Sequence, residues 1–130
     1  MAKIKIKAKD IPGVIFIERN MHDDAVVISG SLSVENVSGE LSACIAQELE
    51  TAARLVSESG GIIGHIKAAV STSAMSMISV TEEKAMIKDS PLSSARITLT
   101  VIVFLIKPED AEDIARKALA AIRRKSRGEE

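Results

Sequence analysis

Apolar and polar residues alternate over several short stretches of this chain, a pattern typical of β-strands. The alternation and the β-branched content predict six strands, over residues 3–7, 14–17, 25–34, 62–71, 74–81 and 96–106. The first of these alternates lysine with isoleucine, which suits a solvated edge strand. The short Thr72-Ser73 link predicts a hairpin, and residues 82–94, which include Pro91, are interpreted as a polar loop.

Two other segments repeat their apolar residues at helical spacing. The first helix is expected to begin at Ser38, a suitable N-cap, and to end at Gly60-Gly61. The second is expected to begin at Pro108, which two acidic residues follow. The apolar stripes are Leu41, Ile45, Leu49, Ala52 and Val56 in the first helix, and Ala111, Ile114, Ala118, Leu119 and Ile122 in the second.

The order of these elements, β-β-β-α-β-β-β-α, predicts an α+β fold built as a two-layer α/β sandwich. The sheet is expected to be mixed and largely antiparallel, because strands 25–34 and 62–71 flank a helix and are predicted to form a right-handed parallel crossover pair. A single apolar stripe on each helix places both helices on one face of the sheet. Residues 1–130 are interpreted as one domain, with a basic C-terminal tail, 124–130, that frays into solvent.

Alternation along each strand sorts the side chains between the two faces of the sheet. The face expected beneath the helices collects Val26, Ile28, Leu32, Val34, Ile62, Ile66, Ala68, Val70, Ile78, Val80, Ile97, Leu99, Val101, Val103 and Leu105. The opposite face collects Ser29, Ser31, Ser33, Glu35, Ile63, His65, Lys67, Ala69, Met75, Met77, Ser79, Thr81, Arg96, Thr98, Thr100, Ile102, Phe104 and Ile106. Exposure to solvent explains its hydroxyl groups but not its apolar members, and an apolar patch of that extent usually meets a partner or a ligand.

Composition narrows the classes of function. With 130 residues, 46% of them hydrophobic and 27% charged, the chain has the make-up of one soluble globular domain. Two Phe, no Tyr and no Trp weaken functions that depend on stacking aromatic rings on nucleic-acid bases. A net charge of −1 argues against nucleic-acid binding driven by bulk electrostatics. A lone cysteine, and the lack of an apolar leader or membrane-spanning segment, favour a cytoplasmic protein, and no motif predicts a metal or a cofactor.

Three side chains of the open face form the best candidate site. His65 is the candidate catalytic residue, since a neutral imidazole beside cations can act as a general base. Lys67 and Arg96 are candidate ligand-binding residues for a small carboxylate or phosphate, with Glu35 at the rim. Solvated or interface-pairing side chains would give the same pattern, and that is the commoner reason for it.

The remaining motifs are weaker indications of a functional site. The Gly60–His65 stretch contains three glycines but follows a helix and enters a strand, the reverse of a phosphate-binding loop. Within it, Gly64 is expected to mark a bulge or a close backbone approach. The His22–Asp24 triplet is typical of a turn rather than a metal site, and Cys44 of a buried, inert thiol. Six basic residues in 116–127 suit a helix C-terminus and only weakly suggest a nucleic-acid contact.

Two hypotheses of different classes follow. The first is a homo-oligomeric binding or assembly module that associates through its open sheet face and holds, at most, a small anionic ligand. The alternative is a small oligomeric enzyme with an anion-binding site at a subunit boundary, formed by His65, Lys67 and Arg96. The residues do not define a substrate or a reaction.

Overall fold

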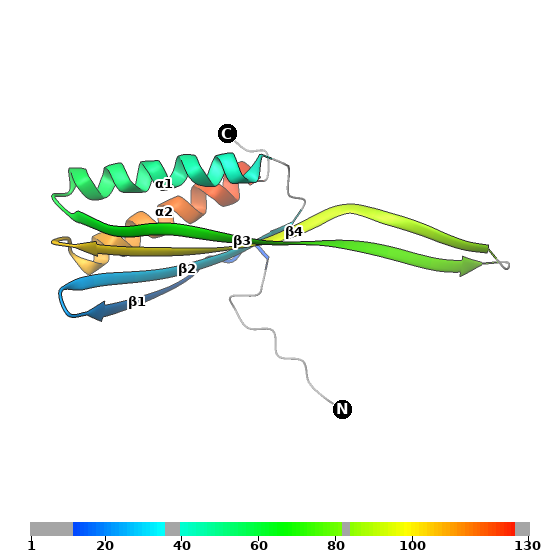
Figure 1. Cartoon of the computed structure of the whole chain (residues 1–130), viewed down its shortest axis with the longest axis horizontal. Coiled ribbons are helices and arrows are strands. Elements are labelled where there is room, and N and C mark those ends of the chain that lie inside the picture. Colours follow the sequence, from blue (N-terminus) through cyan, green and yellow to red (C-terminus); the bar gives the residue numbers. More distant parts are fainter. Residues whose placement is uncertain (1–11, 36–39, 82–83, 127–130) are drawn as a thin grey trace, which may run out of the picture.

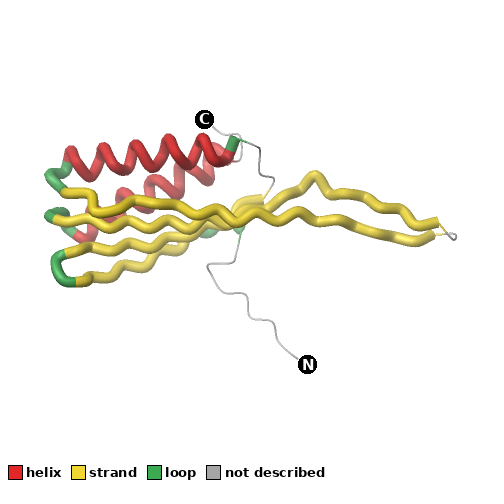
Figure 2. The backbone as a smooth tube through the Cα atoms, in the orientation of Figure 1, coloured by secondary structure: helices red, strands yellow, loops and turns green. Residues whose placement is uncertain are grey.

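The computed structural model describes residues 12–35, 40–81 and 84–126, with the backbone alone over 73–81 and 84–93. Two helices cover one face of a four-stranded antiparallel sheet (Figures 1 and 2). The elements are β1 (Phe16–His22), β2 (Ala25–Glu35), α1 (Leu41–Glu58), β3 (Ile62–Thr81), β4 (Lys84–Phe104) and α2 (Pro108–Ser126). The predicted α+β class is confirmed. The predicted order is wrong, because the described chain runs β-β-α-β-β-α; the predicted strand 3–7 lies outside the described residues.

The strand order in the sheet is β1-β2-β4-β3. The predicted parallel crossover pair is therefore wrong: β2 and β3 run in the same direction, but β4 lies between them and is antiparallel to both. The centre of a sheet suits the strand with the most apolar, β-branched sequence, and the 96–106 stretch has that composition. β4, which follows β3 along the chain, therefore lies between β3 and β2 and pairs with both.

A long hairpin replaces two predicted features. The chain does not turn at Thr72-Ser73; the β3–β4 pairing continues from Ser73 and Ser94 to Thr81 and Lys84. Most of the predicted polar loop, 82–94, is therefore strand, because backbone pairing does not require apolar side chains. Beyond Glu35, which pairs with Ser94, β2 no longer accompanies β4, and the hairpin projects from the body as a two-stranded ribbon (Figure 1).

Pro91 lies at an irregularity in this ribbon. Ala74 pairs with Ser93 but Ser76 pairs with Asp89, so three residues of β4 oppose one of β3. A proline lacks the N–H that the ladder needs, and a bulge accommodates it.

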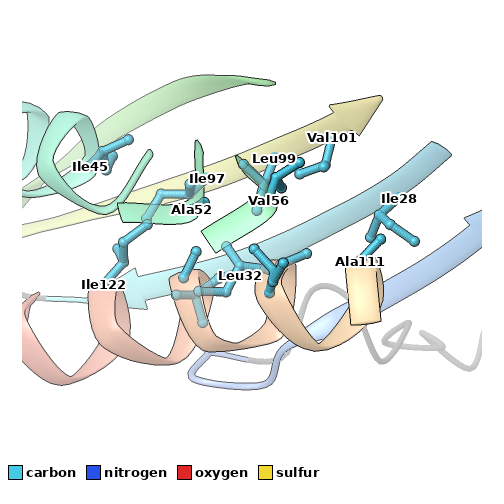
Figure 3. Packing of buried hydrophobic residues seen from close by; sticks show 14 of the residues in the cluster. Ile28, Leu32, Ile45, Ala52, Val56, Ile97, Leu99, Val101, Ala111 and Ile122 are labelled. Carbon is cyan, nitrogen blue, oxygen red and sulfur yellow. The ribbon is translucent and has the colours of Figure 1, made fainter. Parts of the chain in front are cut away.

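The core lies between the sheet and the helices (Figure 3). Predicted alternation is confirmed along β2 and the central part of β4, where the buried residues are Val26, Ile28, Leu32, Val34, Ile97, Leu99, Val101 and Val103. The helix stripes are confirmed as well, since Ile45, Ala52, Val56, Ala111, Leu119 and Ile122 are all buried.

A bulge at Gly64 changes the faces at the start of β3. The register shifts between Ile63 and His65, so that Ile62 pairs with Phe104 and Ile63 with Val103. Directly opposed residues of an antiparallel pair share a face, which places Ile62 on the open face and Ile63 on the helix face. The predicted faces of these two residues are wrong, and the bulge expected from Gly64 is the reason.

Alternation also fails where β4 ends at Phe104. Leu105 adopts a left-handed conformation with φ of 60° and is 75% exposed, so its predicted place in the core is wrong. Ile106, predicted on the open face, instead packs against the core.

The helix ends follow the sequence signals closely. Gly60 has φ of 81° and the N–H of Gly61 donates to the carbonyl of Val56, which confirms the glycine stop of α1. Pro108 begins α2, as predicted. Ser38 lies outside the described residues, and α1 begins after Glu40 without a side-chain cap. The first part of the predicted basic tail is helical, because α2 continues to Ser126.

Candidate functional site

The sheet face turned away from α1 and α2 is the open face, and the register arranges its side chains in rows that cross the strands. Its described members are Phe16, Glu18, Asn20 and His22 on β1; Val27, Ser29, Ser31, Ser33 and Glu35 on β2; Ile62, His65, Lys67, Ala69 and Ser71 on β3; and Ser94, Arg96, Thr98, Thr100, Ile102 and Phe104 on β4. Met75, Met77, Ser79 and Thr81, also predicted on this face, have side chains outside the described part of the structure.

The structure brings together two of the three predicted site residues. His65 and Lys67 are exposed, two residues apart on β3, and point to the same face. Arg96 lies on β4, four residues before Thr100, the pairing partner of Lys67. That offset corresponds to about 13 Å along the strand. The spacing favours two separate positions on the face over one compact anion site.

Neither of two hollows formed by described residues contains these three side chains. One, of about 440 Å³, lies beside Cys44 where the start of α1 meets the end of α2, and Gln47 and Lys125 also line it. Burial raises the pKa of the Cys44 thiol, the Lys125 ammonium opposes that rise, and the Glu48 carboxylate adds to it. A raised pKa is the opposite of what a nucleophilic cysteine needs, in agreement with the expected inert thiol.

The second hollow adjoins the apolar end of the open face. It measures about 720 Å³ and is lined in part by Met21, Ile62, Phe104 and Leu105. Ile62 is 55% exposed. A Cβ on Gly64 would lie 2.9 Å from Cε2 of Phe104, so the glycine leaves room for the ring beside β3. Alternation along β3 placed Ile62 on the helix face. The glycine at position 64, which was expected to mark a bulge, is the sequence feature that could have indicated the change of face.

One row of the open face carries opposite charges at its two ends. Glu18 on β1 pairs with Ser29, Ser29 with Thr100, and Thr100 with Lys67 on β3. Glu18 and Lys67 are exposed, and neither has an ion-pair partner among the described residues. The adjacent row runs Asn20, Val27, Ile102 and His65, with its apolar members at the centre. Sequence reasoning did not single out Glu18, because its strand was predicted to end at Ile17.

A buried hydroxyl lies in the middle of the same face. Ser31 is buried, and its Oγ has no hydrogen-bond partner among the described residues. It is flanked by Phe16 on β1 and Thr98 on β4.

The described residues offer no group of three or more side chains that could hold a metal ion. The His22–Asp24 triplet forms the end of β1 and the turn into β2, and Asp23 has φ of 55°.

No helix in the described part of the chain is both long and apolar enough to span a membrane. Searches of known protein families, of curated proteins and of solved structures found no match.

Proposed function

We propose that this protein is an assembly module in which two copies associate through their open sheet faces. The observation that carries the proposal is the self-complementary pattern of rows on that face. Two sheets packed face to face keep their strands within about 30° of each other, at a separation near 10 Å.

The rows match when a second copy is turned about an axis parallel to the strands. This rotation places β1 of one copy over β3 of the other, and β2 over β4. Glu18 then faces Lys67 of the second copy, and the two-fold symmetry repeats the pair. In the adjacent row, Val27 faces Ile102 of the second copy, so apolar side chains meet at the centre of the interface.

The same rotation pairs a large side chain with a small one. Phe16 shares a row with Ser31, Thr98 and Ala69. Phe16 therefore faces Ala69 of the second copy, and the match of sizes supports close packing there. An apolar centre surrounded by a polar and charged rim is the usual arrangement of a protein interface.

Light scattering coupled to size-exclusion chromatography tests the proposal at micromolar concentration. The full chain is expected to elute as a dimer or a larger even-numbered assembly. Glu18→Lys and Lys67→Glu are each expected to weaken association at least tenfold, and the double variant is expected to restore it. A strictly monomeric wild-type chain, or a double variant no better than the single ones, contradicts the proposal.

A further inference from the structure

We infer that the free edge of β3 is a second association surface, which pairs with β3 of another copy to form one continuous sheet. This inference concerns the edge of the sheet and does not depend on the open face. β3 is the last strand in the order β1-β2-β4-β3, so one side of its backbone has no neighbour among the described strands. Its twenty residues give an edge about 66 Å long.

The sequence of this edge lacks the usual protection. Exposed edge strands commonly avoid pairing with other chains because they carry charged residues or proline, or because they are very short. From Ala68 to Thr81 the chain has no charged residue, no proline and no glycine. The other two free edges differ: β1 has only seven residues and carries Glu18 and Arg19, and the ribbon part of β4 carries lysines, Asp89 and Pro91.

The side chains near the middle of β3 leave room for a neighbouring strand. Val70 lies on the face covered by the helices, yet it is 40% exposed. Ser71 and Thr72, which follow it, are also exposed. Small hydroxyl-bearing residues opposite each other across an antiparallel pair stabilise it.

The lengths of the edges identify the occupant as β3 of a second copy. Pairing with β1 of another copy would cover seven of twenty residues and would propagate into an open chain of molecules. An antiparallel β3–β3 pair related by a two-fold axis near Ser71 and Thr72 covers the whole edge and closes the assembly. It also places the ribbon of each copy along the body of the other. An isolated two-stranded ribbon is only marginally stable, whereas a ribbon that forms part of a wider sheet is more stable.

Cysteine cross-linking tests this arrangement. In a Cys44→Ser background, Val70→Cys, Ser71→Cys and Thr72→Cys are compared with Met21→Cys, an exposed control on the β1 edge. Directly opposed residues of an antiparallel pair have Cα atoms about 4.5–5.5 Å apart, which suits a disulfide. At least one β3 variant is expected to form mostly covalent dimer under mild oxidation, and the control is expected to form at least fivefold less. Equal cross-linking at both edges, or none on β3, overturns the inference.

Charge insertion separates the edge from the open face. Thr72→Lys adds a charge to the β3 edge without altering the open face, and Met21→Lys is its matched control on β1. Thr72→Lys is expected to halve the mass of the assembly, and the control is expected to leave it unchanged. A loss of mass with Glu18→Lys but not with Thr72→Lys overturns edge pairing and supports the open face; the reverse supports edge pairing and overturns the open face.

Discussion

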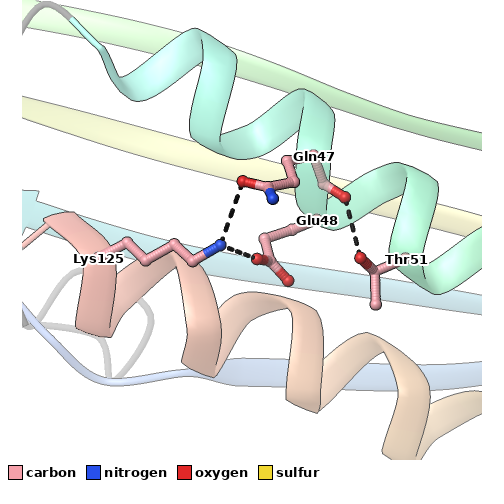
Figure 4. A network of polar contacts seen from close by, with 4 residues as sticks. All are labelled: Gln47, Glu48, Thr51 and Lys125. Carbon is pink, nitrogen blue, oxygen red and sulfur yellow. Dashed lines mark hydrogen bonds and ion pairs between the residues drawn. The ribbon is translucent and has the colours of Figure 1, made fainter. Parts of the chain in front are cut away.

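The Nζ of Lys125 lies 2.6 Å from Oε1 of Glu48 and joins the end of α2 to the middle of α1 (Figure 4). The same ammonium donates to Oε1 of Gln47 at 3.3 Å. Glu48 is a buried member of the face of α1 that packs towards α2, so its charge has few other partners. Lys125 therefore neutralises an acid that the packing of the two helices would otherwise leave in an apolar contact.

Removing Lys125 is expected to cost more than removing an ordinary surface lysine. Lys125→Met leaves the Glu48 carboxylate without its partner, and the free energy of unfolding is expected to fall by about 1–3 kcal/mol. The control is Lys117→Met, which breaks an exposed pair with Asp113 and is expected to cost less than about 0.5 kcal/mol. Urea unfolding followed by circular dichroism measures both. Equal losses would show that the Glu48 contact has no special weight.

The thiol of Cys44 reports on the same helix contact. Because burial raises its pKa, the folded chain holds the thiol proton to a higher pH than the unfolded chain does. The thiol's contribution to stability is therefore present below the pKa of the unfolded chain and is lost as pH rises from that pKa towards the higher pKa of the folded chain. At pH 8, alkylation of Cys44 is expected to be several-fold slower in the native protein than in urea. Lys125→Met, which removes the charge that lowers the pKa, is expected to move the pH midpoint of alkylation upward, and a downward movement would contradict this account.

Much of the body of this fold could be predicted from the pattern of side chains, since burial of one strand face beneath the helices leaves a strong signal with a period of two residues. The apolar core positions recur at every second residue in central β4 from Ile97 to Val103, and in β2 from Val26 to Val34 with Gly30 in the series; these positions are confirmed, although Ser31 on the opposite face of β2 is buried as well. Pro108 and Gly60 likewise act through local backbone chemistry, so a single sequence reveals them.

The errors lie where structure depends on partners distant in sequence. The ribbon is held by pairing between β3 and β4, and its polar side chains carry no periodic signal of burial. The insertion of β4 between β2 and β3 is a choice among sheet orders that the residues of each strand do not encode separately. The placement of the candidate site residues is subject to the same limit, because the distance between Arg96 and Lys67 depends on the register of β3 and β4, which neither strand encodes alone.

The bulge at Gly64 is expected to require glycine. A Cβ there would lie 2.9 Å from Cε2 of Phe104 and 3.1 Å from the carbonyl oxygen of Ile102. The ring can shift but the backbone carbonyl cannot do so without disturbing the β3–β4 pairing, so Gly64→Ala is expected to cost about 1–3 kcal/mol. Ser71→Ala, an exposed substitution on the same strand, is the control and is expected to be nearly neutral at concentrations where the chain is monomeric. Thermal unfolding measures both, and a neutral Gly64→Ala would contradict the assigned register.

The faces assigned by that register make a further prediction for two isoleucines that strand alternation alone places on the same face, beneath the helices. Ile28 is fully buried beneath the helices, whereas Ile62 is more than half exposed on the open face. Ile28→Ala is expected to destabilise the protein by about 2–5 kcal/mol, because it leaves a cavity in the core. Ile62→Ala is expected to change stability by less than about 0.5 kcal/mol at concentrations where the chain is monomeric. Chemical denaturation over a series of protein concentrations measures both. Since Ile62 lies beside the proposed face-to-face contact, a loss of stability in Ile62→Ala that appears only at high concentration would assign the residue to association, and a concentration-independent loss comparable to that of Ile28→Ala would show that the bulge does not turn it outward.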